Sequence, residues 1–583
     1  MIEKTFLLLQ LLSTKKAALA SGLMAAAALL ASCSNDSAES AAPAAPKQTA
    51  AAAADADSQD GPLQEDKRIY ERDKDTRIDT LYLTVPPQTP GADQPPLDWA
   101  AFNRVKDRAE ESELDVIVQE GADDGSGPKA GAFGYAAEEA NGKIALRGNT
   151  ARYVSQHSYK IKLDDRAGLW NDQSILNLNK HPYDPSRFRN KLGFDLFETM
   201  PDMASLRTRF VHLYVKDLSD GAASSGAEYE DYGLFTQIEQ PNKKFLKNHW
   251  LDPYGDLYKA TMFEFLQYPE ALKAKDDPVY DRAAFEQHLE IQGREDHTKL
   301  IAMLDDVNNM SIPIDEVMEK HFDLDNYLTW MAGNILMDNM DTNAQNFLLY
   351  SPLNSEKWYF LPWDYDGAWE LQRKIGSIGT YNNGISNYWG GKLHNRFFRD
   401  EKNVQLLKNK IDELYRGYIN EKILSDLIAK YRPITEAFAR RGPDKYFFPI
   451  PVGDIPADVQ EIAKVPKRSI ERFEQDIQDP KPFFLNDIQQ KDAGILFSWG
   501  DSFDLQGDDL TYTFTLAEDP LFEHIVKQEE VVDANLTLKE PAAGTYYWKV
   551  IVRDTGGHSQ TAFDIYYDAE GAPYYGIRQI EVK

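Results

Sequence analysis

The segment that most constrains the fold is a pair of short apolar runs, Phe347–Tyr350 and Trp358–Leu361, joined by a turn-rich stretch. Apolar runs of this length on either side of a turn predict two strands of a hairpin. Asn346 directly precedes the first run, and Asp364 follows the second. Because a hairpin returns the chain to its starting point, we expect these two oxygen-bearing side chains to lie close enough to share one metal ion.

The polar residues around the hairpin come in an order typical of protein-kinase-type phosphotransferases. Asp341 stands five residues before Asn346, and Asp364 and Asp366 belong to the sequence PWDYDG after the second run. In kinases, an Asp of the catalytic loop, an Asn five residues later and an Asp beyond a hairpin serve the proton and the metal ions. Asp and Asn are also frequent in loops, so a chance D-x₄-N pattern is the alternative. The acidic pair favours the kinase interpretation, since a strand end has no obvious need for two acids.

Length and charge set the outer limits. A chain of 583 residues is too long for one core and predicts two or three domains. The net charge of −30 argues against nucleic acid or an anionic membrane surface as the main partner, since both need a basic patch. A nucleotide site in this chain would need local basic residues or a divalent metal to offset that charge.

Cys33 is the single cysteine, which excludes an intramolecular disulfide and a cysteine-based metal site. Lys15 and Lys16 precede the apolar residues Ala17–Ala31, and the sequence then reads LASC. A positive start, a short apolar stretch and small residues before a cleavage point are typical of a secretory signal. The pattern resembles a bacterial lipoprotein signal, in which Cys33 is lipidated. The alternative, a transmembrane anchor with an incidental cysteine, is disfavoured because the run is short.

Residues 34–66 are mainly Ala, Ser, Pro, Asp and Gln without periodicity, which predicts a flexible tether. The ordered chain is expected to begin with a strand at Arg77–Val85, followed by an amphipathic helix at Trp99–Glu113 and a strand at Leu114–Gln119. Gly121–Gly127 carries two Asp, no Lys and no following helix, so a plain loop is favoured over a phosphate-binding loop.

Lys143–Leu163 contains two strand-like runs around Arg147-Gly148-Asn149-Thr150. In the second run, Lys160 and Lys162 alternate with apolar residues. Lysines on one face of a strand beside a glycine-containing turn could pair with nucleotide phosphates. A solvated strand face is the alternative, and this segment alone favours it.

The second half of the chain is expected to be rich in helices. Leu324–Met337 has apolar residues at helical spacing and should pack in a core. Further helices are expected at Asn403–Arg416, Glu421–Phe438 and Pro456–Ile477, with residues 441–455 as a long insert. Gly376–Gly391 is either an activation-type or acceptor-binding loop or a mobile structural loop.

Five segments together resemble the spore-coat CotH kinase family. They are IALRGNTARYVSQHSYKIKL, SILNLNKHPYDPSRFRNKLGFDL, YGLFTQIEQPNKKFL, GDLYKA and NMDTNAQNFLLY with WYFLPWDYD. Each is weak alone, but five in order are specific, and they extend over roughly residues 77–480. The resemblance implies an atypical protein-kinase fold, with a small β-rich N-lobe and a helical C-lobe that use ATP and a divalent cation, Mg²⁺ or Mn²⁺.

The resemblance also implies roles for individual residues. Asp341 matches the catalytic-loop Asp, Asn346 the metal-binding Asn and Asp364 the second metal-binding Asp, while Asp366 is a further metal ligand or the cap of the next turn. Lys160 is expected to contact phosphate, with Lys162 as the alternative because a one-residue bulge would exchange faces. The remaining nucleotide contacts are Arg147 at the phosphates and Glu239 and Gln240 near the adenine. The sequence departs from the family at His157, where many relatives have Lys, and at Thr150-Ala151.

From about Pro482 the pattern changes to alternating strands with frequent turns, which resembles a fibronectin type III-like sandwich. Trp499 is expected in its core, with Tyr546 or Tyr547 and Trp548 entering from the opposite sheet. Asp504, Asp508 and Asp509 around Gly507 could bind Ca²⁺, although this spacing is also common in solvated hairpins.

These patterns together predict an α+β chain: a two-lobed atypical protein kinase-like domain followed by an all-β immunoglobulin- or fibronectin-like sandwich. The expected divisions are residues 1–33 (lipoprotein signal), 34–76 (tether), 77–480 (CotH kinase-like domain) and 481–583 (sandwich). The expected activity is phosphate transfer from ATP to a protein or surface hydroxyl.

The expected location is the cell envelope, where the lipid anchor would hold the chain outside the cytoplasm, on the outer membrane if the cell has two. The alternative is a non-catalytic surface lipoprotein that binds a protein or glycan, since ATP is scarce outside the cytoplasm. A glycosidase built on two carboxylates lacks a supporting sugar-binding pattern.

Overall fold

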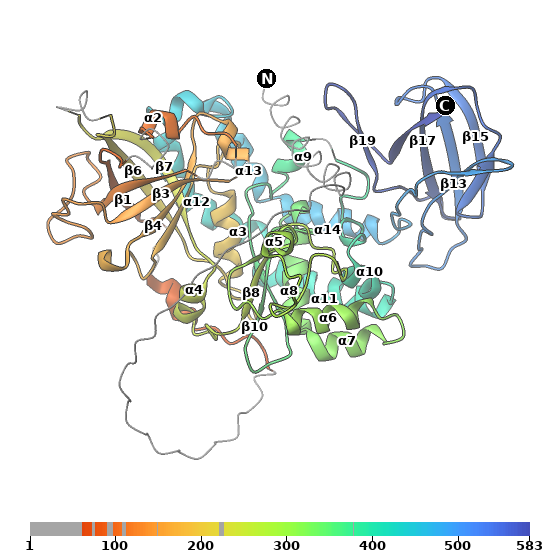
Figure 1. Cartoon of the computed structure of the whole chain (residues 1–583), viewed down its shortest axis with the longest axis horizontal. Coiled ribbons are helices and arrows are strands. Elements are labelled where there is room, and N and C mark those ends of the chain that lie inside the picture. Colours follow the sequence, from red (N-terminus) through yellow and green to blue (C-terminus); the bar gives the residue numbers. More distant parts are fainter. Residues whose placement is uncertain are drawn as a thin grey trace, which may run out of the picture.

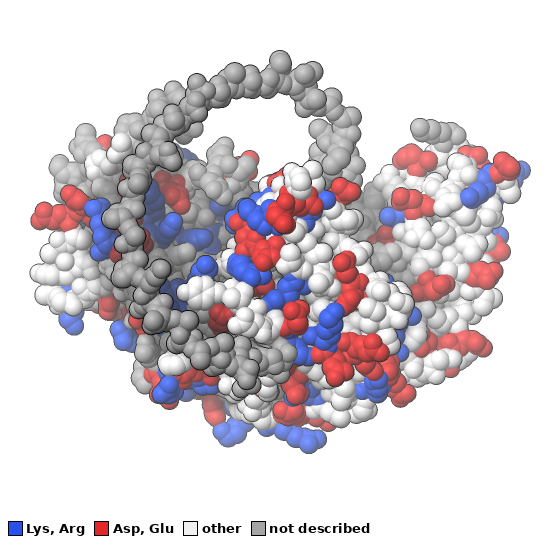
Figure 2. All heavy atoms as spheres, turned by 60° about the horizontal axis from the view of Figure 1, so that its bottom comes forward, with Lys and Arg blue, Asp and Glu red and all other residues white. Residues whose placement is uncertain are grey.

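The computed structural model describes residues 61–72, 76–89, 97–107, 112–148, 150–220, 227–376 and 378–582. The described chain contains strand-rich and helix-rich parts, which confirms the predicted mixed α+β class (Figure 1). The predicted lipidation site, Cys33, and the predicted signal peptide lie outside the described residues. Within the described ranges, no helix combines the length and the hydrophobicity that crossing a membrane requires. Acidic and basic side chains are interspersed over the face that Figure 2 shows.

Seven strands between Ile78 and Glu239 form a closed barrel (Figure 1). The barrel closes where β1 pairs in parallel with β6, from Ile78 opposite Phe210 to Val85 opposite Asp217. All other neighbouring pairs in the barrel are antiparallel. In barrel order the strands are β1 (Ile78–Val85), β2 (Glu113–Glu120), β3 (Gly142–Arg147), β4 (Ser158–Leu163), β5 (Ile175–Asn179), β7 (Glu230–Glu239) and β6 (Thr208–Asp217).

The barrel has its own apolar core, which includes Leu81, Val116, Ile161 and Leu213. The predicted strands near residues 78–85 and 114–119 are confirmed as β1 and β2. The predicted helix at Trp99–Glu113 is wrong in length, because α2 comprises only Trp99–Phe102. The Asn103 amide donates to the Trp99 carbonyl (2.8 Å) and caps this single turn, whose apolar residues already point into the barrel core.

The second core lies beneath a four-stranded sheet in the order β11-β10-β8-β9. These strands are β8 (Asp256–Ala260), β9 (Leu289–Ile291), β10 (Phe347–Ser351) and β11 (Tyr359–Pro362). The helices with buried faces in this core are α3 (Arg189–Phe197), α4 (Lys243–Asn248), α5 (Arg282–Glu286), α6 (Thr298–Asn308), α7 (Ile314–His321), α8 (Leu324–Leu336), α10 (Lys392–Phe398), α11 (Glu401–Gly417), α12 (Glu421–Ala439), α13 (Ile455–Ile462) and α14 (Val465–Asp476). The predicted hairpin and the predicted helices at 324–337, 403–416 and 421–438 are thus confirmed to within a few residues.

The predicted single helix at Pro456–Ile477 is instead two helices, α13 and α14. Pro466 occupies the first turn of α14, where its missing amide hydrogen needs no partner. In a continuous helix the same proline would remove a hydrogen bond and clash with the preceding turn, so the chain breaks there.

Residues 441–455, predicted as a long insert, fasten the helical half to the barrel. Asp444 is buried and forms an ion pair with Lys180 (2.7 Å) at the end of β5. Its second carboxylate oxygen accepts a hydrogen bond from the Leu234 amide of β7 (2.8 Å). The segment therefore contributes a specific contact between two parts of the fold.

The last hundred residues contain two sheets around a third core. One sheet has the order β12-β13-β16; the other has β15-β14-β17-β18, with β21 also on β17. The strands are β12 (Gln489–Lys491), β13 (Gly494–Ser498), β14 (Thr511–Ala517), β15 (Ile525–Val531), β16 (Asn535–Leu538), β17 (Gly544–Arg553), β18 (Ser559–Thr561) and β21 (Ile577–Val582), and β19 (Ile565–Tyr567) pairs with β20 (Pro573–Tyr575). Phe497 of one sheet packs 5.2 Å from the Trp548 ring of the other, and Trp499 and Tyr546 are also buried.

The loop predicted as an activation-type or acceptor-binding segment, Gly376–Gly391, contacts this C-terminal β region. The Tyr381 ring lies 4.9 Å from the Phe563 ring, and its hydroxyl donates to the Phe563 carbonyl (3.1 Å). Asp476 at the end of α14 accepts hydrogen bonds from the Ile385 and Ser386 amides. The loop is therefore held at both of these points.

Candidate functional site

Asp341 and Asn346 lie on the short connection between α8 and β10. Asp341 belongs to a 3₁₀ turn, Met340–Thr342, and Asn346 is the last residue before β10. The Asn346 amide donates to one Asp341 oxygen (2.8 Å), and the Gln345 amide donates to the other (2.5 Å). This contact occupies the nitrogen of Asn346, so its amide oxygen is the atom that could bind a metal ion.

The hairpin places Asp364 next to this connection. Phe347 at the start of β10 pairs with Pro362 at the end of β11, so Asn346 and Asp364 flank the same end of the hairpin. Asn326 of α8 fixes the second strand: its side chain accepts from the Phe360 amide (2.7 Å) and donates to the Phe360 carbonyl (3.0 Å). The hairpin therefore brings the chain back to its starting point, as the sequence predicts.

Both Asn346 and Asp364 have left-handed backbone conformations, with φ of 57° and 60°. Asp338, three residues before Asp341, does so as well, with φ of 51°. Non-glycine residues adopt this conformation at an energetic cost, and they concentrate where side chains must be aimed at a ligand.

The acidic side chains of the site repel one another. Burial raises the pKa of Asp364 well above its usual value, and the charges of Asp366 and Asp341 add to that effect. Burial also raises the pKa of Asp341 to about 6, although the amides of Gln345 and Asn346 oppose the shift. Carboxylates gathered in this way are stabilised in their charged form by a cation.

Asp366 is the most exposed of these acids, with 54% of its side chain accessible. One of its oxygens lies 3.9 Å from Nδ1 of His181. Partial burial acts to raise the pKa of Asp366, but the contact with His181 lowers it overall. Of the two neighbouring carboxylates, Asp364 is therefore the one that binds a proton first.

Arg147 at the end of β3 provides positive charge from the barrel side. Its guanidinium donates to Asn179 (2.7 Å) and Asn177 (3.4 Å) of β5 and lies 5.6 Å from the Trp363 ring, directly before Asp364. The charge of Arg147 lowers the pKa of Asp364. The structure therefore brings the predicted phosphate contact to the predicted metal ligand.

Lys160 and Lys162 are both exposed on the same face of β4. The pairing with β3 is regular throughout, so the bulge that would exchange their faces is absent from this strand. Lys160 is the nearer to Arg147: burial lowers the pKa of Lys160, and the charge of Arg147 lowers it further. Lys162 pairs with Lys143 and Ile175, farther along the strand.

Glu239 and Gln240, predicted near the adenine, have different surroundings. Glu239 is 1% exposed, and its oxygens contact Arg207 (2.7 Å) and His249 (2.8 Å). Gln240 is half-buried and accepts a hydrogen bond from the amide of Asn177 (3.0 Å), the same residue that contacts Arg147. Gln240 is thus linked to the site through β5, whereas the carboxylate of Glu239 is engaged elsewhere.

Two residues of the site were not predicted from the sequence. Asn190 of α3 donates to Asp364 (3.4 Å) and accepts from the Tyr365 amide (3.0 Å). Lys259 of β8 lies 5.4 Å from the Trp363 ring and lowers the pKa of Asp364. Lys259 could have been predicted as a site residue, because it is the only charged residue in the apolar sequence LYKA. No feature of the sequence around Asn190 indicates its role.

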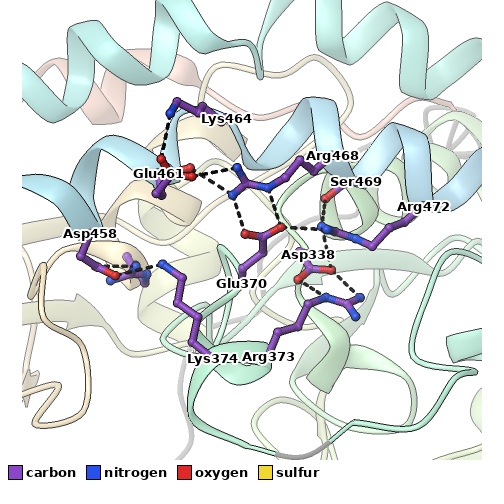
Figure 3. A network of polar contacts seen from close by, with 11 residues as sticks. Asp338, Glu370, Arg373, Lys374, Asp458, Glu461, Lys464, Arg468, Ser469 and Arg472 are labelled. Atoms are coloured by element: carbon purple, nitrogen blue, oxygen red, sulfur yellow. Dashed lines mark hydrogen bonds and ion pairs between the residues drawn. The ribbon is translucent and has the colours of Figure 1, made fainter.

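A network of ion pairs supports the site from the side of α14 (Figure 3). Arg373 donates two hydrogen bonds to Asp338 (2.7 and 2.8 Å). Arg472 of α14 donates to Glu370 (2.8 Å), which also accepts from Arg468 (2.9 Å). Arg472 also lies 3.5 Å from Asp338, which precedes the turn that carries Asp341, so the network ties this segment to α14.

A second branch of the network reaches α3. Asp458 of α13 pairs with Lys374 (2.9 Å) and with Arg189 (2.8 Å), the first residue of α3. Arg189 is fully buried and also pairs with Asp184 (2.5 Å). Because Asn190 follows Arg189, this branch orients the side chain that contacts Asp364.

Comparison with known proteins shows the family of the chain. The family described as CotH kinase protein matches residues 144–465, more than half of the chain. The inner spore coat protein H of Bacillus subtilis (strain 168) is 24% identical over 227 residues, which are 39% of this chain. The match spans only 58% of that relative's length.

A Helicobacter pylori proinflammatory kinase, CtkA, aligns over 54% of this chain and 91% of its own, at 12% identity. With a TM-score of 0.19, this alignment supports no conclusion about the site. The family match includes β3 and β4, the Asp341–Asn346 connection and the hairpin. The chain belongs to the CotH kinase protein family.

Proposed function

We propose that the chain is a divalent-metal-dependent phosphotransferase that moves phosphate from ATP to a hydroxyl of a protein or surface acceptor. The observation that carries the proposal is the meeting of Asp341, Asn346 and Asp364 with Arg147 at one end of the hairpin. Membership of the CotH kinase protein family supports a kinase-like activity. In this proposal the barrel and the helical half correspond to the two lobes of a kinase.

The donor set fits a hard cation. Asn346, Asp364 and Asp366 offer oxygen ligands of the kind that Mg²⁺ and Mn²⁺ prefer. The raised pKa of Asp364 reflects burial and repulsion between carboxylates, which a divalent cation would relieve. When bound, the metal would neutralise phosphate charge. Arg147 and Lys160, with Lys162 as the alternative, would orient the phosphates, and Gln240, with Glu239 as the alternative, would lie near the adenine.

Asp341 is the proposed base. The amides of Gln345 and Asn346 orient its two oxygens, and a pKa of about 6 leaves the carboxylate ionised at neutral pH but basic enough to accept a proton. Transfer should therefore decline as the pH falls through about 6, because protonated Asp341 cannot accept the hydroxyl proton. Bound metal would lower the pKa of Asp341 and so move this decline in transfer to lower pH.

The wider setting is also part of the proposal. Lipidation at Cys33 would tether the chain outside the cytoplasm, in the cell envelope, and the acceptor would be a protein or surface molecule there rather than nucleic acid. The two C-terminal sheets would form a fibronectin type III-like module that spaces or docks the kinase-like domain.

The test is a calorimetric titration of ATP with Mg²⁺ or Mn²⁺, together with a phosphotransfer assay. Asp341→Asn should retain metal-dependent ATP binding while kcat falls by about 10²- to 10⁴-fold. Asp325→Asn, an exposed substitution of the same kind on α8, is the matched control and should change neither quantity. If the unaltered chain binds no ATP with either metal, a non-catalytic surface protein becomes the better assignment.

A further inference from the structure

Three carboxylates from two loops meet at one end of the C-terminal β region. Asp504 and Asp508 lie between β13 and β14, and Asp554 directly follows β17. One oxygen of each lies within 4.8 Å of the other two. Asp504 and Asp554 are each only 7% exposed, so two of these like charges are placed together away from water. Such a group needs a compensating cation.

Asp504 provides a second and independent observation. Its Oδ1 accepts hydrogen bonds from the Gln506 amide (2.9 Å) and the Asp508 amide (2.9 Å). Its Oδ2 is buried without a hydrogen-bond partner among the described residues. A buried carboxylate oxygen without a partner is unfavourable, and its most common explanation is an ion or water that belongs there.

The charged groups around the cluster compensate it only in part, because the ion pair of His558 is with Asp554. His558 contacts Asp554 through its amide (2.8 Å) and Nδ1 (2.9 Å), and Thr555 donates to Asp508 (2.7 Å). Lys481 is buried nearby, but its ammonium donates to the carbonyl oxygens of Asp476 and Asp479. Within the described chain, neither Asp504 nor Asp508 has a Lys or Arg nitrogen at ion-pair distance.

We infer that Asp504, Asp508 and Asp554 bind a Ca²⁺ ion. Ca²⁺ takes oxygen ligands at about 2.3–2.6 Å, so ligands across the ion lie up to about 5 Å apart, whereas Mg²⁺ requires about 4 Å. The three oxygens lie within 4.8 Å of one another, close enough to ligate one ion, and a site built from several protein carboxylates is more typical of Ca²⁺ than of Mg²⁺. The remaining positions of the bound ion would be filled by backbone carbonyls or water. Asp509, which the sequence grouped with these residues, is exposed and outside the cluster, while Asp554 takes its place.

The position of the site indicates its role. The Ser502 hydroxyl donates to the Lys481 carbonyl (2.6 Å), and the Lys481 amide donates to the Phe503 carbonyl (2.8 Å). Gln506 donates to the Ile477 carbonyl (3.0 Å) just beyond α14. The loop that carries Asp504 is therefore one of the segments that join the β region to the helical half, and a bound ion would hold this junction together.

The experiment is a calorimetric Ca²⁺ titration of the full chain carrying Asp364→Asn, which removes the metal ligand of the proposed nucleotide site. We expect one Ca²⁺ to bind, with weaker binding of Mg²⁺. Adding Asp504→Asn or Asp508→Asn should weaken Ca²⁺ binding on the order of tenfold or more. Asp509→Asn makes the same chemical change one residue from Asp508 and should leave the affinity unchanged.

Thermal unfolding of the same variants keeps the inference testable if a titration is weak. Ca²⁺ should raise the Tm of the parent and of Asp509→Asn, but not that of Asp504→Asn. In a chelator, Asp504→Asn should melt at the same temperature as the parent or higher, because it removes an uncompensated buried charge. Absence of Ca²⁺ binding in the parent, or equal losses in Asp504→Asn and Asp509→Asn, would overturn the inference. Neither result depends on whether the chain transfers phosphate.

Discussion

Glu239 and Asp364 show how differently one protein can surround two carboxylates that it withdraws from water. Glu239 contacts Arg207 and His249, and His249 in turn contacts Glu65 (2.5 Å). Burial acts to raise the pKa of Glu239, but His249 and Arg207 lower it to about 2. The pKa of Asp364 moves the other way, because burial and neighbouring acids outweigh Arg147 and Lys259.

The opposite pKa shifts distinguish a carboxylate with a structural role from one that is suited to bind a ligand. Each carboxylate oxygen of Glu239 has a cationic partner within the protein, so nothing further is required for its stability. Asp364 has the amide of Asn190 at 3.4 Å and two acids as neighbours, an arrangement that a folded protein keeps only where a function uses it. The contrast favours Asp364 as a metal ligand and Glu239 as a residue that holds the barrel to α4.

The largest expected effect is that of Asp364→Asn. Metal-dependent ATP binding should be lost and transfer should fall roughly 10⁴-fold or more, because the metal supplies several kcal/mol of stabilisation. In metal-free buffer at neutral pH the same variant should unfold at the same temperature as the parent or higher, since a carboxylate with a raised folded-state pKa destabilises the fold when ionised. Calorimetry and thermal unfolding measure the two effects. A clear drop in metal-free Tm would instead place Asp364 among the structural charges.

Glu239→Gln should have the opposite signature. It removes the carboxylate that Arg207 and His249 share, leaving His249 with Glu65, and should reduce the free energy of unfolding by about 3–5 kcal/mol. ATP affinity should stay within a factor of about two. Urea unfolding and the ATP titration test both points. If stability is kept while ATP binding is lost, Glu239 belongs to the nucleotide site, as the resemblance to the CotH kinase family implies.

The same cluster should make stability depend on pH. Burial acts to lower the pKa of His249, but Glu239 and Glu65 raise it from 6.5 to about 9 in the folded chain. The resulting stability is fully present below pH 6.5 and is lost as the pH rises through about 9, a change of about 3 kcal/mol. The free energies of unfolding of the parent and of His249→Gln should converge as the pH rises from 6.5 to about 9. Parallel curves would contradict the assignment.

The smallest expected effect distinguishes the two lysines of β4. Lys160→Met should weaken ATP binding about tenfold, the size of one lost charge-assisted hydrogen bond. Lys162→Met removes an equally exposed ammonium two residues away and should change the affinity less than about twofold. If Lys162→Met weakened ATP binding more than Lys160→Met, the phosphates would lie farther along the strand, away from Arg147.

Local patterns predicted much of this arrangement. The hairpin follows from two short apolar runs, α8 from its helical spacing, and the meeting of Asn346 with Asp364 from the geometry of a hairpin. The site residues that escaped prediction reach the hairpin from distant elements. Asn190 contacts Asp364 from 174 positions away, a separation at which no local pattern carries information.

Errors in the predicted elements have equally physical causes. The apolar residues of 456–477 have the spacing of one helix, but Pro466 breaks it in two. A proline fits the first turn of a helix and not its interior. The predicted Ca²⁺ ligands included Asp509 because it is adjacent in sequence, whereas Asp554 approaches from another loop. Spacing identifies ligands on one loop but not those that the fold adds from a second.

The closed barrel also bears on how the chain avoids pairing with copies of itself. Closure through β1 and β6 leaves the barrel without a free strand edge, the surface on which β-sheet aggregation begins. The C-terminal sheet has such an edge in β15, and there the sequence IVKQEEV places Lys527, Glu529 and Glu530 along it. The barrel therefore avoids a free edge by topology, whereas the C-terminal sheet covers its β15 edge with charge, so substitutions that neutralise β15 should favour edge-to-edge aggregation.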